Sequence, residues 1–101
     1  MSFRTYDRQQ RVARATQAMH DIRALQWDWL NRIGTAPHTV FVDNVTFFAL
    51  ASDPHVGWLD GTSFAPGDQQ TLLGMRLRRV LTSDTLIQVV GDLPLAPGAL
   101  Q

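Results

Sequence analysis

The chain has 101 residues, of which 45% are hydrophobic and 18% are charged, so it has the length of one domain with a modest core and not the composition of a disordered protein. It contains no cysteine, which excludes a disulfide scaffold and a thiolate metal site. Nine basic and nine acidic residues give a formal net charge of zero, which counts against a nucleic-acid-binding protein.

Charge is unevenly distributed along the chain. Residues 1–32 contain six Arg and three Asp, whereas residues 33–75 contain four Asp and neither Arg nor Lys. A basic segment therefore precedes an acidic one, which predicts mutual attraction or two differently charged faces. Since no stretch approaches the roughly 18 consecutive apolar residues of a spanning helix, we expect any membrane anchor of the natural protein to lie upstream.

The stretch from Thr5 to Ile33 predicts one long amphipathic helix, and we assign residues 1–34 of the domain to this helix and its ends. Gly and Pro are absent from it, and Gly34 is a good left-handed cap. Its apolar or near-apolar positions recur in steps of three and four: Val12, Ala15, Met19, Ile22, Gln26, Trp29 and Ile33. This spacing fits either a coiled-coil seam, with Gln26 setting the register, or a helix packed on its own sheet.

Two tryptophans of this helix, Trp27 and Trp29, point about 200° apart, so both cannot be buried in one small core. Amphipathic aromatic residues are favoured at interfaces. We therefore predict a partner interface formed by Trp27, Trp29, Gln26 and Ile33.

The segment from Thr39 to about Leu50 is rich in β-branched and aromatic residues and predicts a strand. Asp43 and Asn44 interrupt it, as a bulge or as the turn of a tight hairpin, and we favour one interrupted strand. After a turn at residues 52–55, a second strand is expected over residues 56–65, with Trp58 and Phe64 supplying most of its apolar area.

Residues 68–82 fit two patterns. A helix capped by Asp68 would have one apolar face, formed by Leu73, Leu77, Val80 and Leu81. In a strand, apolar residues would alternate with Gly74 and two arginines: the apolar ones are Leu73, Met75 and Leu77, and the arginines Arg76 and Arg78. The cap, the length and the unbranched residues favour helix. Residues 85–90 predict a strand, and residues 92–101 an irregular tail.

These elements predict a single α+β domain, residues 1–101, with a β-β-α-β core over residues 38–91. We expect an antiparallel sheet of three or four strands, with the long helix and the 68–82 helix packed on one face.

Chemical motifs are scarce. The histidines, His20, His38 and His55, share no metal-ligand spacing, and neither GxSxG, GxGxxG nor GxxxxGK[ST] occurs. We expect no metal, cofactor or catalytic site. The alternative is a small α+β ligand-binding protein or enzyme whose pocket, between the long helix and the sheet, is lined by His38, His55 and Trp58.

Arginines recur on one side of the long helix and again near residue 78. A solvated charged face is the default interpretation, and contact with acidic lipid headgroups or an acidic partner is the functional one. A third hypothesis is a phage or plasmid accessory protein that binds a host protein or, less favoured, nucleic acid through this basic patch. Its residues are Arg4, Arg8, Arg11, Arg76 and Arg79.

Two segments, WLNRIGTAPHTVFVDNVTF and LDGTSFAPGDQQTLLGMRLRRVLTSDTLIQVV, resemble the fimbrial-assembly family of type IV pilus and type II secretion inner-membrane proteins. The shared features are a helix that passes through a proline into a strand, Gly61 after an apolar strand, a helix with paired leucines, and a closing β-branched strand. This sequence departs from the family in lacking the membrane helix before the coil.

The resemblance implies a ferredoxin-like half-fold on the periplasmic side of a bacterial inner membrane, close to the membrane through an upstream anchor. It also implies a non-catalytic assembly or scaffold module that forms a homodimer or pairs with a related subunit of a pilus or secretion platform. Without the resemblance, the expected location is cytoplasmic.

Overall fold

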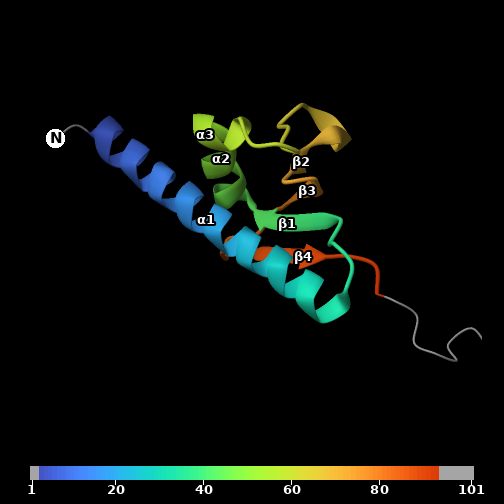
Figure 1. The fold of residues 1–101 in the computed structure, drawn as a ribbon. Helices are drawn as coiled ribbons and strands as arrows, with labels where there is room; N and C mark the ends of the chain where they lie inside the picture. Colours follow the sequence, from blue (N-terminus) through green and yellow to red (C-terminus); the bar gives the residue numbers. More distant parts are fainter. Residues whose placement is uncertain (1–2, 94–101) are drawn as a thin grey trace, which may run out of the picture.

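The computed structural model describes residues 3–93, with side chains from residue 9 onward, and has an α+β fold built on one long helix and a four-stranded mixed sheet (Figure 1). The expected tail lies outside the described residues from residue 94 onward. The elements in chain order are α1 (Phe3–Ile33), β1 (Thr39–Asp43), α2 (Asn44–Ser52), α3 (Pro54–Gly57), a 3-10 turn (Gly67–Gln69), β2 (Thr71–Leu72), β3 (Met75–Val80) and β4 (Ile87–Val90).

The long helix α1 forms as the periodicity predicts. Ala15, Met19 and Ile22 are buried in the core, whereas Val12, one step earlier in the same stripe, is 47% exposed. The stripe therefore packs on the protein's own core from Ala15 onward. The helix ends at Ile33 and is capped by Gly34, which has φ of 90° and donates its N–H to the Leu30 carbonyl at 2.8 Å.

The sheet has the strand order β2-β3-β1-β4. Strand β1 pairs in parallel with β3 and antiparallel with β4, while β2 and β3 form an antiparallel pair. The expected antiparallel sheet is therefore wrong, and the ferredoxin-like β-β-α-β half-fold is not confirmed. The physical reason is that helix α2 directly follows β1 and returns the chain across the sheet, so the strand that later pairs beside β1 runs in the same direction.

The predicted strand from Thr39 to Leu50 is wrong after Asp43. Asp43 caps α2 by accepting the main-chain N–H of Thr46 at 3.0 Å, and Phe47 and Leu50 are then buried on one side of that helix. Helical burial of these residues outweighs the β-propensity of the segment, which tertiary packing routinely overrides.

The other two middle elements were also predicted wrongly. Residues 56–65 contain the end of α3 and turns, and pair with the sheet only through a bridge between Ser63 and Thr71. Residues 68–82 are not a helix: β2 and β3 form a hairpin whose turn places Leu73 and Gly74 at positive φ. The alternating pattern holds within β3, where Met75 and Leu77 are buried and Arg76 is exposed.

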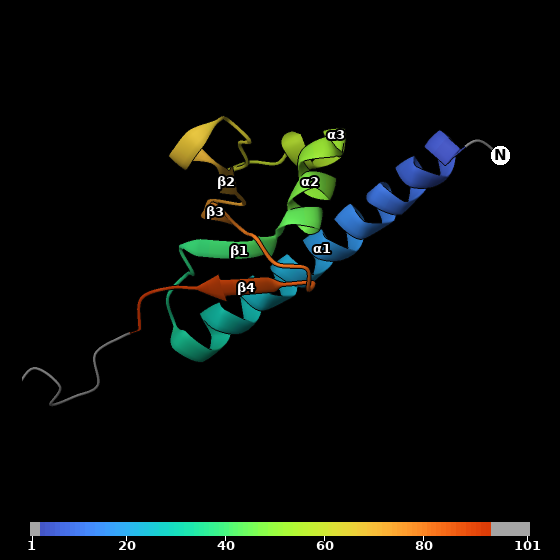
Figure 2. The ribbon, with the colours of Figure 1, turned by 180° about the vertical axis from the view of Figure 1, so that it is seen from behind.

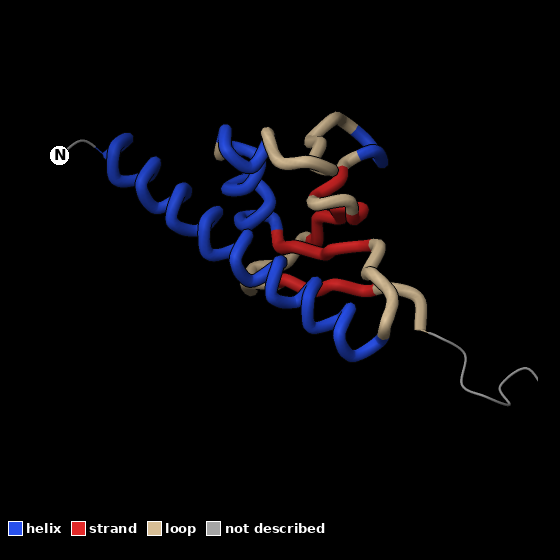
Figure 3. The backbone as a smooth tube through the Cα atoms, in the orientation of Figure 1, coloured by secondary structure: helices blue, strands red, loops and turns tan. Residues whose placement is uncertain are grey.

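Helices cover one face of the sheet, as Figure 3 shows, although the second helix is α2 and not residues 68–82. The buried strand residues Val40, Val42, Leu77 and Val89 belong to the same core cluster as residues of α1 and α2. Seen from behind, β1 and β4 have no helix in front of them (Figure 2). Strand β4 was predicted correctly, and it forms one edge of the sheet.

Candidate functional site

The two tryptophans of α1 occupy different environments. Trp29 is half-buried and packs against the core cluster, whereas the side chain of Trp27 is 63% exposed. Gln26 lies between these directions and donates a long hydrogen bond, 3.4 Å, to the Leu73 carbonyl in the hairpin turn. Ile33 is half-buried at the end of the helix. Of the four predicted interface residues, Trp27 therefore presents the most free apolar surface.

Trp29 fits against the end of the sheet. A Cβ atom added to Gly91 would lie 2.9 Å from the Trp29 Nε1 atom and 2.9 Å from the Cα atom of Pro37. The indole Nε1 is buried and has no hydrogen-bond partner among the described residues. Trp29 is thus a packing residue that only a glycine at position 91 accommodates.

Beside Trp27 the surface is hollowed. A depression of about 200 Å³ lies between the last turns of α1 and the segment that leads into β1. Leu30, which is 37% exposed, adds apolar area next to Trp27. We call this surface the Trp27 hollow, and it is lined by Gln26, Trp27, Leu30, Ala36 and Pro37.

The predicted basic patch does not form one surface among the described side chains. The side chains of Arg4 and Arg8 lie outside the described part. Arg79 lies on the helix-covered side of the sheet, with its guanidinium carbon 5.3 Å from the Phe47 ring centroid and 5.6 Å from that of Phe48. Arg76 belongs to the opposite face, because side chains three apart on a strand alternate sides.

The predicted histidine pocket is likewise not assembled. His38 precedes β1, where its Nδ1 atom lies 2.8 Å from the Thr39 hydroxyl and its Nε2 atom 3.4 Å from the Asp92 carboxylate. His55 lies in α3, which follows α2. Helix α2 begins at the end of β1, whereas His38 precedes the start of β1, so the two histidines are at opposite ends of this strand. Trp58 is 87% exposed. Among the described residues, no group of three or more His, Asp or Glu side chains could hold a metal ion.

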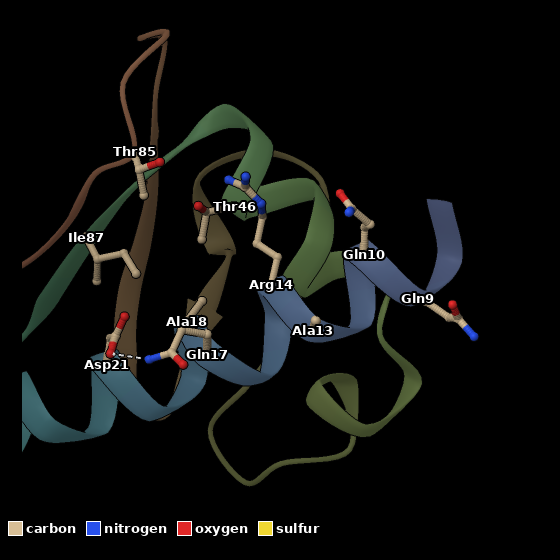
Figure 4. Close-up of a pocket in the computed structure, with 10 residues that line it drawn as sticks. All are labelled: Gln9, Gln10, Ala13, Arg14, Gln17, Ala18, Asp21, Thr46, Thr85 and Ile87. Carbon is tan, nitrogen blue, oxygen red and sulfur yellow. Dashed lines mark hydrogen bonds between the residues drawn. The ribbon is translucent and has the colours of Figure 1, made fainter. Parts of the chain in front are cut away.

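A larger groove, of about 620 Å³, lies between α1 and the start of β4. Figure 4 shows that Arg14, Gln17 and Asp21 lie on one side of α1, where Arg14 extends towards Thr46 at the start of α2 and Asp21 points towards Ile87. Gln17 donates a hydrogen bond of 2.9 Å to Asp21, and Arg14 is exposed and forms no ion pair with any described side chain. This groove was not predicted from the sequence, although Arg14, Gln17 and Asp21 recur at helical spacing on one side of α1.

Thr46, which lines this groove, is held in place by the buried Asp43. Its carboxylate accepts hydrogen bonds from the Thr46 hydroxyl, the Thr46 main-chain N–H and the Leu86 main-chain N–H. Burial on its own would raise the pKa of Asp43, but these hydrogen bonds to the charged form outweigh it and hold the pKa below the ordinary carboxyl value. Asp43 thus remains ionised and fixes both α2 and the chain entering β4.

Comparison with protein-family models, with curated proteins and with solved structures found no match for the chain. Within the part of the chain that the structure describes, no helix has both the length and the apolar character needed to cross a membrane.

Proposed function

We propose that this chain is a non-catalytic assembly module that pairs with a second copy of itself or with a related subunit through the Trp27 hollow. The observation behind this proposal is the contrast between the two tryptophans of α1. Trp29 packs against the core cluster, whereas most of the Trp27 side chain, 63%, stays exposed and is available to a partner.

Burial of this surface would give a favourable free energy of association. Tryptophan is enriched at the energetic centres of interfaces because it combines a large apolar area with few rotatable bonds. Leu30 extends the apolar surface, and the hollow beside it offers space for a side chain of a partner. A symmetric dimer needs one self-complementary patch of this kind on each copy.

The setting that we propose follows from the family resemblance. In a pilus or secretion platform, the module would lie on the periplasmic side of the inner membrane and pair with a sister subunit there. The α+β fold with a long first helix is compatible with that role, and the proposal assigns no reaction to the chain.

Sedimentation velocity over a wide concentration range tests self-association. We expect the wild-type chain to form dimers, and Trp27→Ala to raise the dimer dissociation constant at least about tenfold, as loss of an interface tryptophan does. Trp58→Ala is the matched control, because Trp58 is also highly exposed but lies after α3, away from the hollow.

A wild-type chain that stays monomeric at millimolar concentration would contradict self-association. A dimer that Trp58→Ala weakens as much as Trp27→Ala would contradict the assignment of the interface to the Trp27 hollow. Circular dichroism of each variant verifies that the fold is unchanged.

A further inference from the structure

The outer edge of β4 has unused hydrogen-bonding groups. Strand β4 is the last strand of the sheet on its side, and within residues 3–93 no other strand pairs with its outer edge. The segment TLIQVV around it contains neither charge nor proline, the features that usually protect an edge strand from pairing.

The register shows which main-chain groups face outward. Asp43 donates its N–H to the Leu86 carbonyl at 3.0 Å, and Phe41 lies opposite Gln88. Hydrogen-bonded pairs alternate in an antiparallel ladder, so Leu86, Gln88 and Val90 direct their N–H and C=O groups to β1. The N–H and C=O groups of Ile87 and Val89 therefore point away from the sheet.

The groove beside α1 adjoins this edge. Its strand wall is formed by Thr85 and Ile87, and its helix wall by the side of α1 that carries Arg14 and Asp21. Gln26 of α1 contacts the turn of the β2–β3 hairpin, at the edge of the sheet opposite β4. On the helix, Gln26 lies about 140° around the axis from Asp21. The Arg14–Asp21 side of α1 is thus the side next to the free edge of β4.

A helix beside an unpaired strand edge is a geometry suited to an extended peptide, which adds as a further strand and places alternate side chains in the groove. Arg14 and Asp21 lie about 10 Å apart along α1, the span of roughly three extended residues. They offer an anion at the start of β4 and a cation beside the segment that enters it, which contains Thr85. The charges therefore match a peptide with a negative group at one end and a basic residue about three positions away.

The packing of α1 on β4 relates the direction of an added strand to the two charges of the groove, and we take the antiparallel pairing, which is slightly the more stable per residue. The helix runs beside β4 in the same sense, since Asp21 lies in the groove with Ile87, whereas Trp29 lies against Gly91. A strand antiparallel to β4 that continues about three residues past the start of β4 ends on the Arg14 side. Its terminal carboxylate then faces Arg14, and a basic side chain three residues earlier faces Asp21.

A second copy of the chain fits this edge less well. Helix α1 packs on α2 and β4, so it lies over the outermost strand. Two copies of β4 paired edge to edge would be about 4.8 Å apart, whereas packed helices need about 8–10 Å between their axes. In an antiparallel pair the two α1 helices would lie on the same face of the joined sheet and collide, and a single peptide strand has no such helix.

We infer that the chain binds an extended peptide with a free C-terminal carboxylate and a basic residue about three positions before it, as a fifth strand on β4. This site is separate from the Trp27 hollow and does not depend on self-association.

An NMR titration of the isotope-labelled full chain tests this inference. The probe is an N-acetylated hexapeptide of valine and threonine, with one lysine three residues before its free carboxylate. We expect saturable shifts at the start of β4 and new protection from hydrogen exchange for the Ile87 and Val89 amides, with little change at Gln88.

Arg14→Gln should weaken binding about tenfold, the effect of losing one charge-assisted contact. Arg23→Gln, an exposed arginine elsewhere on α1, should leave it unchanged.

Two modified peptides make the test independent of protein stability. Backbone N-methylation at the residues that face β4 should abolish binding, whereas methylation at the alternate residues should not. Equal effects of the two methylation patterns, shifts confined to the Trp27 hollow or to the open face of the sheet, or no binding at millimolar peptide would overturn the inference. Protection of Ile87 and Val89 in concentrated protein without peptide would also overturn it, because a second copy would then occupy the edge.

Discussion

The carboxylate of Asp43 accepts the main-chain N–H of Leu86 at 3.0 Å, across 43 positions of the chain. The same side chain caps α2 through the N–H of Thr46. One buried residue at the end of β1 therefore joins the start of α2 to the segment that enters β4. The Thr46 N–H would otherwise be unpaired, because a first-turn helix N–H has no partner within its own helix.

Replacement of Asp43 by Asn should destabilise the fold. The amide oxygen can replace only one of the two carboxylate oxygens, and the NH₂ group in place of the other would face a main-chain N–H, either of Thr46 or of Leu86, that then has no acceptor. We expect the free energy of unfolding at neutral pH to fall by about 1–3 kcal/mol, the cost of a lost cap and an unsatisfied buried donor. Urea unfolding followed by circular dichroism measures it. Asp60→Asn, at an exposed site, should change it by less than about 0.5 kcal/mol.

The fall in the free energy of unfolding caused by Asp43→Asn should also depend on pH. The pKa of Asp43 is lower in the folded state than in the unfolded chain, so its stabilisation is fully present above the unfolded pKa. That stabilisation is lost as the pH falls through the lower, folded pKa. The difference in unfolding free energy between wild type and Asp43→Asn should therefore be largest at neutral pH and shrink in acid. A difference that is constant from neutral pH into strong acid would contradict this role.

Gly91→Ala should destabilise the contact between α1 and the end of β4. The added Cβ would lie 2.9 Å from the Pro37 Cα atom, a main-chain atom that cannot move alone. We expect a loss of about 1–3 kcal/mol, typical of overpacking, in urea unfolding. Gly57→Ala is the control, since its Cβ would meet nothing within 4 Å. An equal effect of the two substitutions would show that the Trp29–Gly91 contact is not tight.

Gly61→Ala and Gly74→Ala separate backbone strain from steric overlap. Both glycines have positive φ, 73° and 82°, so each alanine bears a strain of about 1–2 kcal/mol. Only at Gly61 would the Cβ also lie 2.6 Å from the Gly74 nitrogen, whose N–H bonds the Gly61 carbonyl. We expect the melting temperature to fall clearly further for Gly61→Ala. Matching melting temperatures would mean that the loop at Gly61 moves aside freely.

The surface properties were predictable only in part. The opposed directions of Trp27 and Trp29 follow from helix geometry, but nothing local decides which ring is buried. Which ring is buried depends on where the sheet lies, because Gly91 at the end of β4 packs against Trp29. The groove at Arg14 required tertiary structure as well, since its strand wall comes from residues about 70 positions later along the chain.

The sequence by itself determined α1, because 31 residues without Gly or Pro repeat one apolar spacing many times, and it determined β4, a β-branched run with no competing pattern. Only the tertiary structure decided residues 44–52 and 68–82. Each is a short apolar run compatible with helix and strand, so small local preferences could not select between them. The bonds of Asp43 to Thr46 and Leu86, and the burial of Met75 and Leu77 beside β1, supplied the larger free energies that made one a helix and the other a hairpin.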